Sequence, residues 1–290
     1  RKQLVAENLD MPNGIAVCGT SLYVVTNQSI LRFPIQAPFQ GTRIYHGLPA
    51  KRHHGWRYAV CDGQQSLIIS IGVPCNICQV DEEQFGILTR FHLATRQFEV
   101  LAAGIRNAVG MAWDPKRQFL WFTDNGRDWL GDDLPPDELN RLPMQKSELS
   151  GGVPHYGFPY LHGRSTIDPI FGKQRPKDLT IHPPVWEFAA HVAPLGLTFV
   201  HDKDWRSEVG DLLIAQHGSW NRSQKIGYRV VALRLNGDAV IGQTMFLDGF
   251  LDTSGQVRGR PVDVVFLKNG TLLVSDDANG AIYSVMRQSR

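Results

Sequence analysis

Three short segments decide the fold of this chain: Leu195–Phe199 (LGLTF), Asp211–Ala215 (DLLIA) and Tyr228–Leu233 (YRVVAL). Each is apolar and contains β-branched or aromatic residues, and the segments between them contain glycine. Short apolar runs bounded by turn residues predict β-strands. Three such runs in succession predict a small antiparallel sheet in which neighbours in the sequence are neighbours in space.

The same three-strand unit occurs five times along the chain. The other four copies are Ile15–Val17, Leu22–Val25 and Ile30–Phe33; Arg57–Val60, Leu67–Ser70 and Ile87–Phe91; Val109–Trp113, Leu120–Thr123 and Glu138–Leu142; and Pro261–Phe266, Thr271–Ser275 and Ala281–Val285. Small sheets that recur every ~40–85 residues are typical of a β-propeller. A β-sandwich would not repeat one strand order five times, and no stretch has a strong amphipathic helical pattern. We therefore predict an all-β chain that forms a single β-propeller domain over residues 1–290.

A long insertion, at about residues 125–190, separates the third and fourth units. Loops of this length in a compact domain are usually functional or disordered. The aromatic, proline and histidine residues of this segment argue against disorder. We expect the insertion to have a function.

The composition is that of an ordinary soluble protein, with 42% hydrophobic and 20% charged residues. Thirty Lys and Arg residues nearly balance 28 Asp and Glu residues, which gives no reason to expect nucleic acid or an anionic membrane as a partner. No apolar run approaches the ~20 residues that cross a bilayer. The first six residues lack the features of a signal peptide, so the chain is cytoplasmic, mature or a fragment.

Two of the four cysteines form a C-x-x-C motif, Cys75-Asn76-Ile77-Cys78. No second C-x-x-C is present to complete a zinc site. Gln79 stands where a haem-attachment motif requires histidine. A redox-active pair, a local disulfide and two loop thiols remain as interpretations.

Polar residues precede the first strand at corresponding positions in two of the units. They are His53 and His54 in one unit and Arg106 and Asn107 in the next. If the units are arranged radially, these positions converge on one axis. A base and a cation would then face a common pocket.

Several motifs together resemble the sorbosone/glucose dehydrogenase family of pyrroloquinoline quinone (PQQ)-dependent enzymes. The likeness covers nearly the whole chain in order. It is carried by His53–Arg57, Gly72 with Cys75–Cys78, Gly104–Asn107, Trp121–Asp128, Asp137–Asn140, His217–Arg222, Gly259–Val264 and Ser275–Asp277.

The resemblance implies a six-bladed propeller that holds PQQ and Ca²⁺ and oxidises an aldose or a sugar aldehyde, in the periplasm or outside the cell. About five blades are visible in this chain. Either the first blade is missing or five blades close differently, and we favour a missing first blade. Because the chain contains no cytochrome motif, electrons would pass to a separate carrier.

The family's catalytic histidine stands four residues before an arginine, which selects His53 as the general base and Arg57 as that arginine. An imidazole suits this step because its pKa is near neutrality. If the segment is extended, His54 points elsewhere, although it is a candidate cofactor contact together with His53. Arg106 and Asn107 match the family pair that polarises the quinone oxygen.

Further cofactor contacts follow from the same resemblance. Arg260 matches an arginine that binds a PQQ carboxylate, and Arg258 is a candidate helper. The chain departs from the family pattern at Pro12, Gly218 and Val262, where the family has cofactor-binding side chains. Asn221 and Arg222 are candidates to replace these contacts.

Calcium prefers oxygen ligands, often backbone carbonyls of a tight loop. Gly126 and Arg127 align with the two carbonyl donors to the calcium beside PQQ. Glu138 and Tyr156 resemble ligands of a second, structural calcium. The pair Asp132 and Asp133 is more simply an exposed acidic turn.

Two other functions remain open. One is a calcium-dependent, lactonase-type hydrolase, in which Asp, Asn and Glu side chains would hold a central ion. The other is a propeller without catalytic activity that serves as a binding module.

Overall fold

The protein is described by a computed structural model that covers residues 3–63, 65–145 and 152–287. The chain divides into two compact units. The N-terminal unit takes residues 1–109, 151–160 and 169–182, and the C-terminal unit takes residues 110–150, 161–168 and 183–290. Each unit is built almost entirely of antiparallel sheets.

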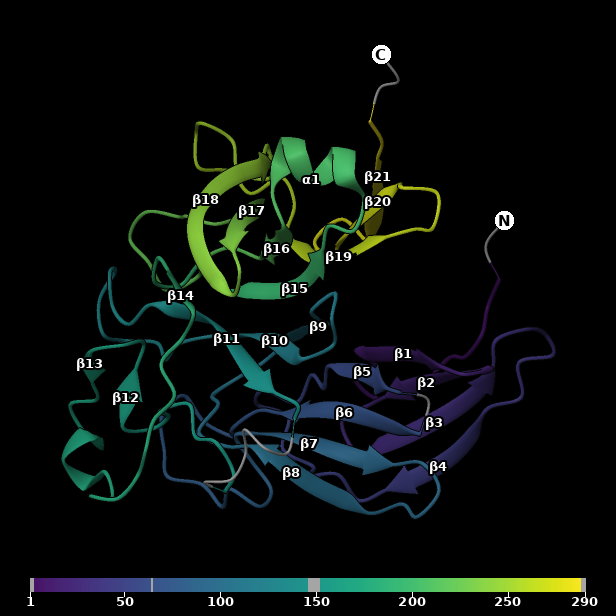
Figure 1. Ribbon diagram of the computed structural model, residues 1–290, viewed down its shortest axis with the longest axis horizontal. Coiled ribbons are helices and arrows are strands. Elements are labelled where there is room, and N and C mark those ends of the chain that lie inside the picture. Colours follow the sequence, from purple (N-terminus) through teal and green to yellow (C-terminus); the bar gives the residue numbers. More distant parts are fainter. Residues whose placement is uncertain (1–2, 64, 146–151, 288–290) are drawn as a thin grey trace. The chain divides into compact units, whose positions relative to one another are not determined.

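The N-terminal unit contains two four-stranded meanders, in which each strand pairs with the next along the chain (Figure 1). The first sheet comprises β1 (Gly14–Cys18), β2 (Ser21–Val25), β3 (Ser29–Pro34) and β4 (Thr42–His46). The second comprises β5 (Ala59–Asp62), β6 (Ser66–Ile71), β7 (Ile87–His92) and β8 (Phe98–Ala102).

The C-terminal unit contains three sheets of the same type and a two-stranded hairpin. One sheet has β9 (Gly110–Trp113), β10 (Phe119–Asp124), β11 (Asp137–Pro143) and β14 (Trp186–Phe188). The next has β15 (Pro194–Phe199), β16 (Leu212–Gln216), β17 (Arg229–Asn236) and β18 (Ala239–Leu247), and the last has β19 (Pro261–Phe266), β20 (Leu272–Asp276) and β21 (Ala281–Val285). The hairpin is β12 (Leu161–His162) and β13 (Thr166–Ile167).

These five meanders confirm the predicted all-β chain of β-propeller blades, because every predicted strand falls in the expected sheet. Four sheets have an additional outer strand that the sequence did not reveal: β4, β8, β14 and β18. The outer strand β18 is largely exposed or half-buried, so it lacks a marked apolar pattern. The short helix α1 (Lys203–Val209) was not predicted either, and the Asp202 side chain caps it by accepting hydrogen bonds from the amides of Asp204 and Trp205. None of the helices in the described ranges has the length and apolar character needed to span a membrane.

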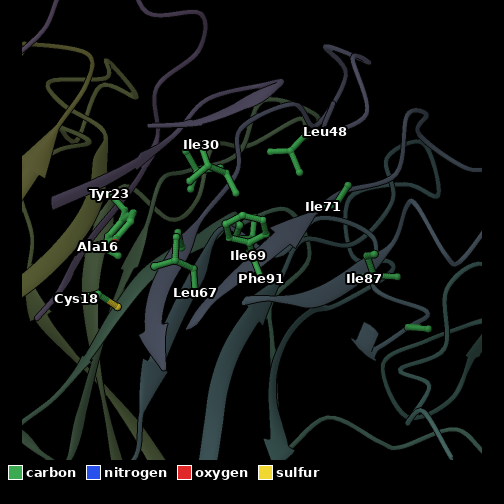
Figure 2. Close-up of a cluster of buried hydrophobic side chains, with 13 residues drawn as sticks. Ala16, Cys18, Tyr23, Ile30, Leu48, Leu67, Ile69, Ile71, Ile87 and Phe91 are labelled. Atoms are coloured by element: carbon green, nitrogen blue, oxygen red, sulfur yellow. The ribbon is translucent and has the colours of Figure 1, made fainter. Parts of the chain in front are cut away.

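Figure 2 shows the core of the N-terminal unit, in which residues from both of its sheets pack together. Ile30, Leu67, Ile69 and Phe91 are fully buried there. A disulfide between Cys18 at the end of β1 and Cys61 in β5 joins the two sheets. This bond was not predicted, because the two cysteines are 43 residues apart and belong to different repeats.

The first strands of neighbouring sheets approach closely within the C-terminal unit. A Cβ atom on Gly110 of β9 would collide with the carbonyl of Leu195, and a Cβ atom on Gly196 of β15 would collide with Asp263. Glycine is therefore required at these positions so that the strands can pack.

We predict that Gly196→Ala destabilises the protein by about 1–3 kcal/mol, because the added methyl group overlaps the backbone and side chain of Asp263. Urea unfolding measures the effect. Gly242→Ala on β18 is the matched control, since nothing lies within 4 Å of its Cβ position. Equal stability of the two variants would show that the strands do not depend on this close approach.

Candidate functional site

The two histidines lie in a turn that precedes β5. His54 has a left-handed backbone, with φ of 50°. The segment is therefore not extended, and the condition under which His54 would point away from His53 is not met. The two imidazole rings lie edge to face, with 4.2 Å between their centroids.

His54 is held by a hydrogen bond of 2.9 Å between its Nδ1 and the carbonyl oxygen of Val73. Because a carbonyl can only accept, Nδ1 carries the proton and Nε2 keeps its lone pair. Burial lowers the pKa of His54 to about 2, with further contributions from the charges of Arg106 and His53. His54 is therefore neutral at physiological pH.

Arg57 stabilises this turn by hydrogen bonds to its backbone. Its side chain is buried and donates to the carbonyl oxygens of His54 at 3.2 Å and Pro49 at 2.7 Å. Burial lowers the pKa of Arg57 to about 10, which leaves the guanidinium charged at neutral pH. The arginine that identified the histidine motif thus fixes the backbone of the turn.

Arg106 is buried beside this pair, and it donates from Nε to the carbonyl oxygen of Asn76 at 2.9 Å and from Nη2 to the Asn76 Oδ1 at 2.8 Å. His54 and Asn107 both flank Gly72, where a Cβ atom would lie 2.7 Å from the His54 Cβ and 3.0 Å from the Asn107 Oδ1. The N-terminal unit thus brings His53, His54, Arg106 and Asn107 together, as the repeat positions suggested.

In the C-terminal unit, Arg260 lies against the loop that begins at His217. It donates to the carbonyl oxygens of His217 at 3.2 Å and Gly218 at 2.9 Å. His217 contacts Asp277 at 3.0 Å, and burial is the main cause that lowers the pKa of His217. A guanidinium therefore lies at Gly218, where the family pattern has a lysine.

Asn221 and Arg222 follow in the same loop. Arg222 donates to the carbonyl oxygen of Asp132 and, at 2.8 Å, to the Asp133 carboxylate. The Asn221 Nδ2 and the Arg222 Nε are buried and have no hydrogen-bond partner in the part of the chain that the structure describes. The acidic turn is thus an anchor for Arg222, and two donors remain unsatisfied beside it.

Arg258 is placed differently from the other cationic candidates. Its side chain is 57% exposed and forms an ion pair with Asp252 at 2.9 Å. The predicted role of Arg258 as a helper in cofactor binding gains no support from this position.

Gly126 and Arg127 are fixed by two acidic side chains. The Gly126 amide donates to the Asp137 Oδ1 at 2.7 Å. Arg127 forms a buried ion pair of 2.6 Å with Asp168, and His162 lies 3.0 Å from the same carboxylate oxygen. The Gly126 amide and the Arg127 side chain are therefore both fixed by carboxylates of the C-terminal unit.

Glu138 on β11 is buried and stands directly opposite Asp124 of β10. It accepts hydrogen bonds from the Gly163 amide at 2.6 Å and from the Asn140 Nδ2 at 2.9 Å. Burial, followed by the charge of Asp124, raises the pKa of Glu138 to about 8. The Asn140 Oδ1 is buried without a partner among the described residues, so one buried acceptor remains unsatisfied beside Glu138.

Tyr156 belongs to the N-terminal unit. It is buried, its amide donates to the Ala103 carbonyl at 2.9 Å, and its ring lies 5.8 Å from that of His182. Across the described residues, no three His, Cys, Asp or Glu side chains gather in a way that could hold a metal ion.

Asn76, which binds Arg106, was not among the predicted site residues, and its position inside the C-x-x-C motif was the signal that could have identified it. The structure resolves the three interpretations of that motif in favour of a local disulfide between Cys75 and Cys78. Asp277 was also missed as the partner of His217, because that pairing joins two sheets.

Comparison with known proteins agrees with the motifs. Residues 172–288 match the family model described as TrAA12-like. The chain resembles this family, which confirms the likeness inferred from the sequence. An uncharacterised protein of Borreliella burgdorferi is 35% identical over 236 residues, which cover 80% of this chain and 60% of that protein.

Several solved structures share the fold at low sequence identity. The calcium structure of the AA12-family carbohydrate-active enzyme of Trichoderma reesei has a TM-score of 0.76 and 17% identity, and the match covers 93% of this chain and 79% of that one. The PQQ domain of pyranose dehydrogenase from Coprinopsis cinerea, in its holo form, has a TM-score of 0.73 and 16% identity, with 98% and 94% covered. The soluble aldose sugar dehydrogenase of Escherichia coli, in its apo form, has a TM-score of 0.58 and 17% identity, with 95% of each chain covered.

We predict that, with calcium chelated, the stabilising contribution of Glu138 is lost as the pH rises from about 5 to 8, so that the stability of the wild-type protein relative to Glu138→Gln falls over this interval. In the unfolded chain Glu138 ionises near its ordinary pKa, whereas in the folded state it keeps its proton up to about pH 8. The unfolded state is therefore favoured over this interval, and glutamine removes the titration. Thermal unfolding across the pH range measures both curves, and parallel curves would contradict the buried, protonated carboxyl group.

Proposed function

We propose that the protein is an oxidoreductase that uses PQQ and Ca²⁺ to oxidise an aldose or a sugar aldehyde. The observation that carries the proposal is the cluster in the N-terminal unit, where two adjacent imidazoles, one of them neutral, lie beside the buried guanidinium of Arg106. A proton acceptor next to a fixed cation suits removal of a hydroxyl proton while negative charge develops nearby. The structures of pyranose and aldose sugar dehydrogenases that share the fold support the same reading.

The residues fit PQQ, which is planar and carries three carboxylates. In the N-terminal unit, His53, His54, Arg106 and Asn107 would contact it. Asn221, Arg222 and Arg260, which the family resemblance also implies as cofactor contacts, lie in the C-terminal unit. The unsatisfied donors of Asn221 and Arg222 are the groups that an anionic oxygen would satisfy, because a buried donor without a partner costs free energy.

The residues also fit calcium. Glu138, Asp124 and Asn140 offer oxygen atoms in a buried position, and a cation there would favour the ionised form of Glu138. Gly126 and Arg127 would supply the carbonyl oxygens for the ion associated with PQQ, and Tyr156 remains a candidate ligand of the second ion.

The candidate residues divide the chemistry between them. His53 takes the substrate hydroxyl proton, because its side chain is exposed and can release that proton to solvent. His54 is better suited to accept a hydrogen bond in its neutral form, since burial and Arg106 oppose its protonation. Arg106 and Asn107 orient and stabilise the developing negative charge. PQQ, when bound, supplies the acceptor for the hydride.

Two further features belong to the proposal. The disulfides Cys18–Cys61 and Cys75–Cys78 are consistent with a periplasmic or secreted location, where such bonds persist. Electrons would leave to a separate carrier, either a soluble protein or a cytochrome.

The test of the proposed function is an absorption titration. The protein is mixed with PQQ and calcium, D-glucose is then added, and the spectrum of the bound quinone is followed. Reduction of the quinone supports the proposal. A folded protein that leaves the spectrum unchanged with glucose and with a panel of other aldoses and sugar aldehydes contradicts it and favours a binding module.

His53→Ala is expected to lower kcat by roughly 10²–10⁴ while PQQ remains bound, because it removes the general base. His54→Ala should lower kcat less. His201→Ala, an exposed histidine in the C-terminal unit, is the matched control and should retain wild-type rates. An inactive His54→Ala together with an active His53→Ala would overturn the assignment of the base.

Removal of calcium is expected to lower the unfolding temperature and to weaken PQQ binding, because a ligand that binds only the folded state stabilises it. Glu138→Gln should lose part of the stabilisation by added calcium, whereas Glu83→Gln, at an exposed position, should keep all of it. Differential scanning calorimetry with chelator and with added calcium measures both. No response to calcium in the wild-type protein would contradict the roles given to Gly126, Arg127 and Glu138.

A further inference from the structure

The loop between β6 and β7 contains a four-residue ring, closed by the disulfide between Cys75 and Cys78. The two cysteines are three residues apart, with Cα atoms 6.2 Å from each other. A ring this small leaves the enclosed backbone few conformations. Asn76 lies inside it and is therefore a rigid point in an otherwise irregular loop.

Asn76 binds Arg106 through two atoms at once. The Arg106 Nε donates to the Asn76 backbone carbonyl at 2.9 Å, and Nη2 donates to the Asn76 Oδ1 at 2.8 Å. These two N–H groups lie on the same edge of the planar guanidinium, so a single residue fixes both the position and the plane of the group. Lysine in place of Arg106 could not be held in this way.

The same loop also forms a hydrogen bond with His54. The Val73 amide donates to the Arg106 carbonyl at 2.9 Å, and the Val73 carbonyl accepts from the His54 Nδ1 at 2.9 Å. His54 and Arg106 are thus both fixed by one segment of four residues, Val73 to Asn76. Displacement of this segment would change the orientation of the imidazole and the guanidinium together.

We propose that Asn76, held by the Cys75–Cys78 disulfide, is a positioning residue that orients Arg106 toward the cofactor. This inference rests on the proposed function, in which Arg106 contacts the quinone. The role of the disulfide is then geometric, because it restrains the backbone around Asn76.

Burial makes the orientation of Arg106 consequential. A guanidinium that is only 4% exposed cannot exchange its protein partners for water without cost. Its two bonds to Asn76 satisfy part of that requirement before any ligand arrives. The cation is therefore already aligned when the cofactor binds, and binding need not supply the free energy to align it.

The test compares four variants of the whole chain. Asn76→Ala removes the side-chain acceptor, and Asn76→Asp restores an acceptor at the same atom. Cys75→Ser/Cys78→Ser opens the ring. Cys18→Ser/Cys61→Ser is the matched control, because it removes the other disulfide of the N-terminal unit and leaves Asn76 untouched.

The first readout needs no cofactor. In protein labelled with ¹⁵N-arginine, the Arg106 Nη2–H signal, assigned by its loss in Arg106→Lys, reports the bond to the Asn76 Oδ1. We expect this signal to shift and to exchange faster with solvent in Asn76→Ala and in Cys75→Ser/Cys78→Ser. It should recover in Asn76→Asp and remain unchanged in Cys18→Ser/Cys61→Ser.

The second readout is the affinity for PQQ in the presence of calcium. Loss of a bond to a charged group should raise the Kd at least about tenfold in Asn76→Ala, and further in the variant with the open ring. The control is expected to unfold at a lower temperature but to keep the wild-type Kd at a temperature where it is folded.

The outcomes separate the two proposals. Failure of the wild-type protein to bind PQQ refutes the proposed function, whatever the Arg106 signal does. Binding by the wild-type protein, with an unchanged Arg106 signal and unchanged Kd in Asn76→Ala and the open-ring variant, refutes the positioning role alone. An equal loss of affinity in both double cysteine variants would also refute it, because general destabilisation would then explain the effect.

Discussion

Both faces of the second strand are buried in one sheet of each unit. All six residues of β6 and all five residues of β16 are buried. A strand with two apolar faces cannot be exposed to water on either one, so each sheet must be covered by packed neighbours on both sides. Packing of small sheets face to face follows from this constraint, and so does the need for close approach at positions such as Gly196.

Because the strands are packed in this way, most of the polar candidate site residues lie in the segments that precede or follow the strands. The turn before β5 carries the histidines, and the segment before β9 carries Arg106 and Asn107. Loops on a rigid scaffold are the usual location of binding and catalytic groups. Here the loops are restrained as well, by Arg57 under the histidine turn and by the disulfide ring that contains Asn76.

Buried charge is the second recurring feature. Arg106 and the pair of Arg127 with Asp168 are largely removed from water, and Glu138 keeps its proton up to about pH 8. Isolated buried charges are costly, and pairing offsets only part of that cost. These buried charged groups are among the residues proposed to bind PQQ and calcium or contact them directly. A site that is formed before its ligands bind accounts for this cost in stability.

The sequence by itself determined the repeating unit. Short apolar strands such as those of β10, β16 and β20 were predicted because a strand with buried faces must be apolar along its length. The outer strand β18 was not, since exposure to water removes that pattern. The sequence also singled out the histidine pair and the Arg106–Asn107 pair from their matching positions in two repeats.

Only the tertiary structure decided which groups meet. Three interactions depend on strand register and on the packing of loops. They are the disulfide between Cys18 and Cys61, the hydrogen bonds between Asn76 and Arg106, and the contact with Asp124 that helps to raise the pKa of Glu138. It likewise showed that His54 is turned back beside His53 rather than away from it. Residue types and spacing limit which contacts are possible, but distance, burial and orientation are fixed only when the sheets have paired and the loops have closed over them.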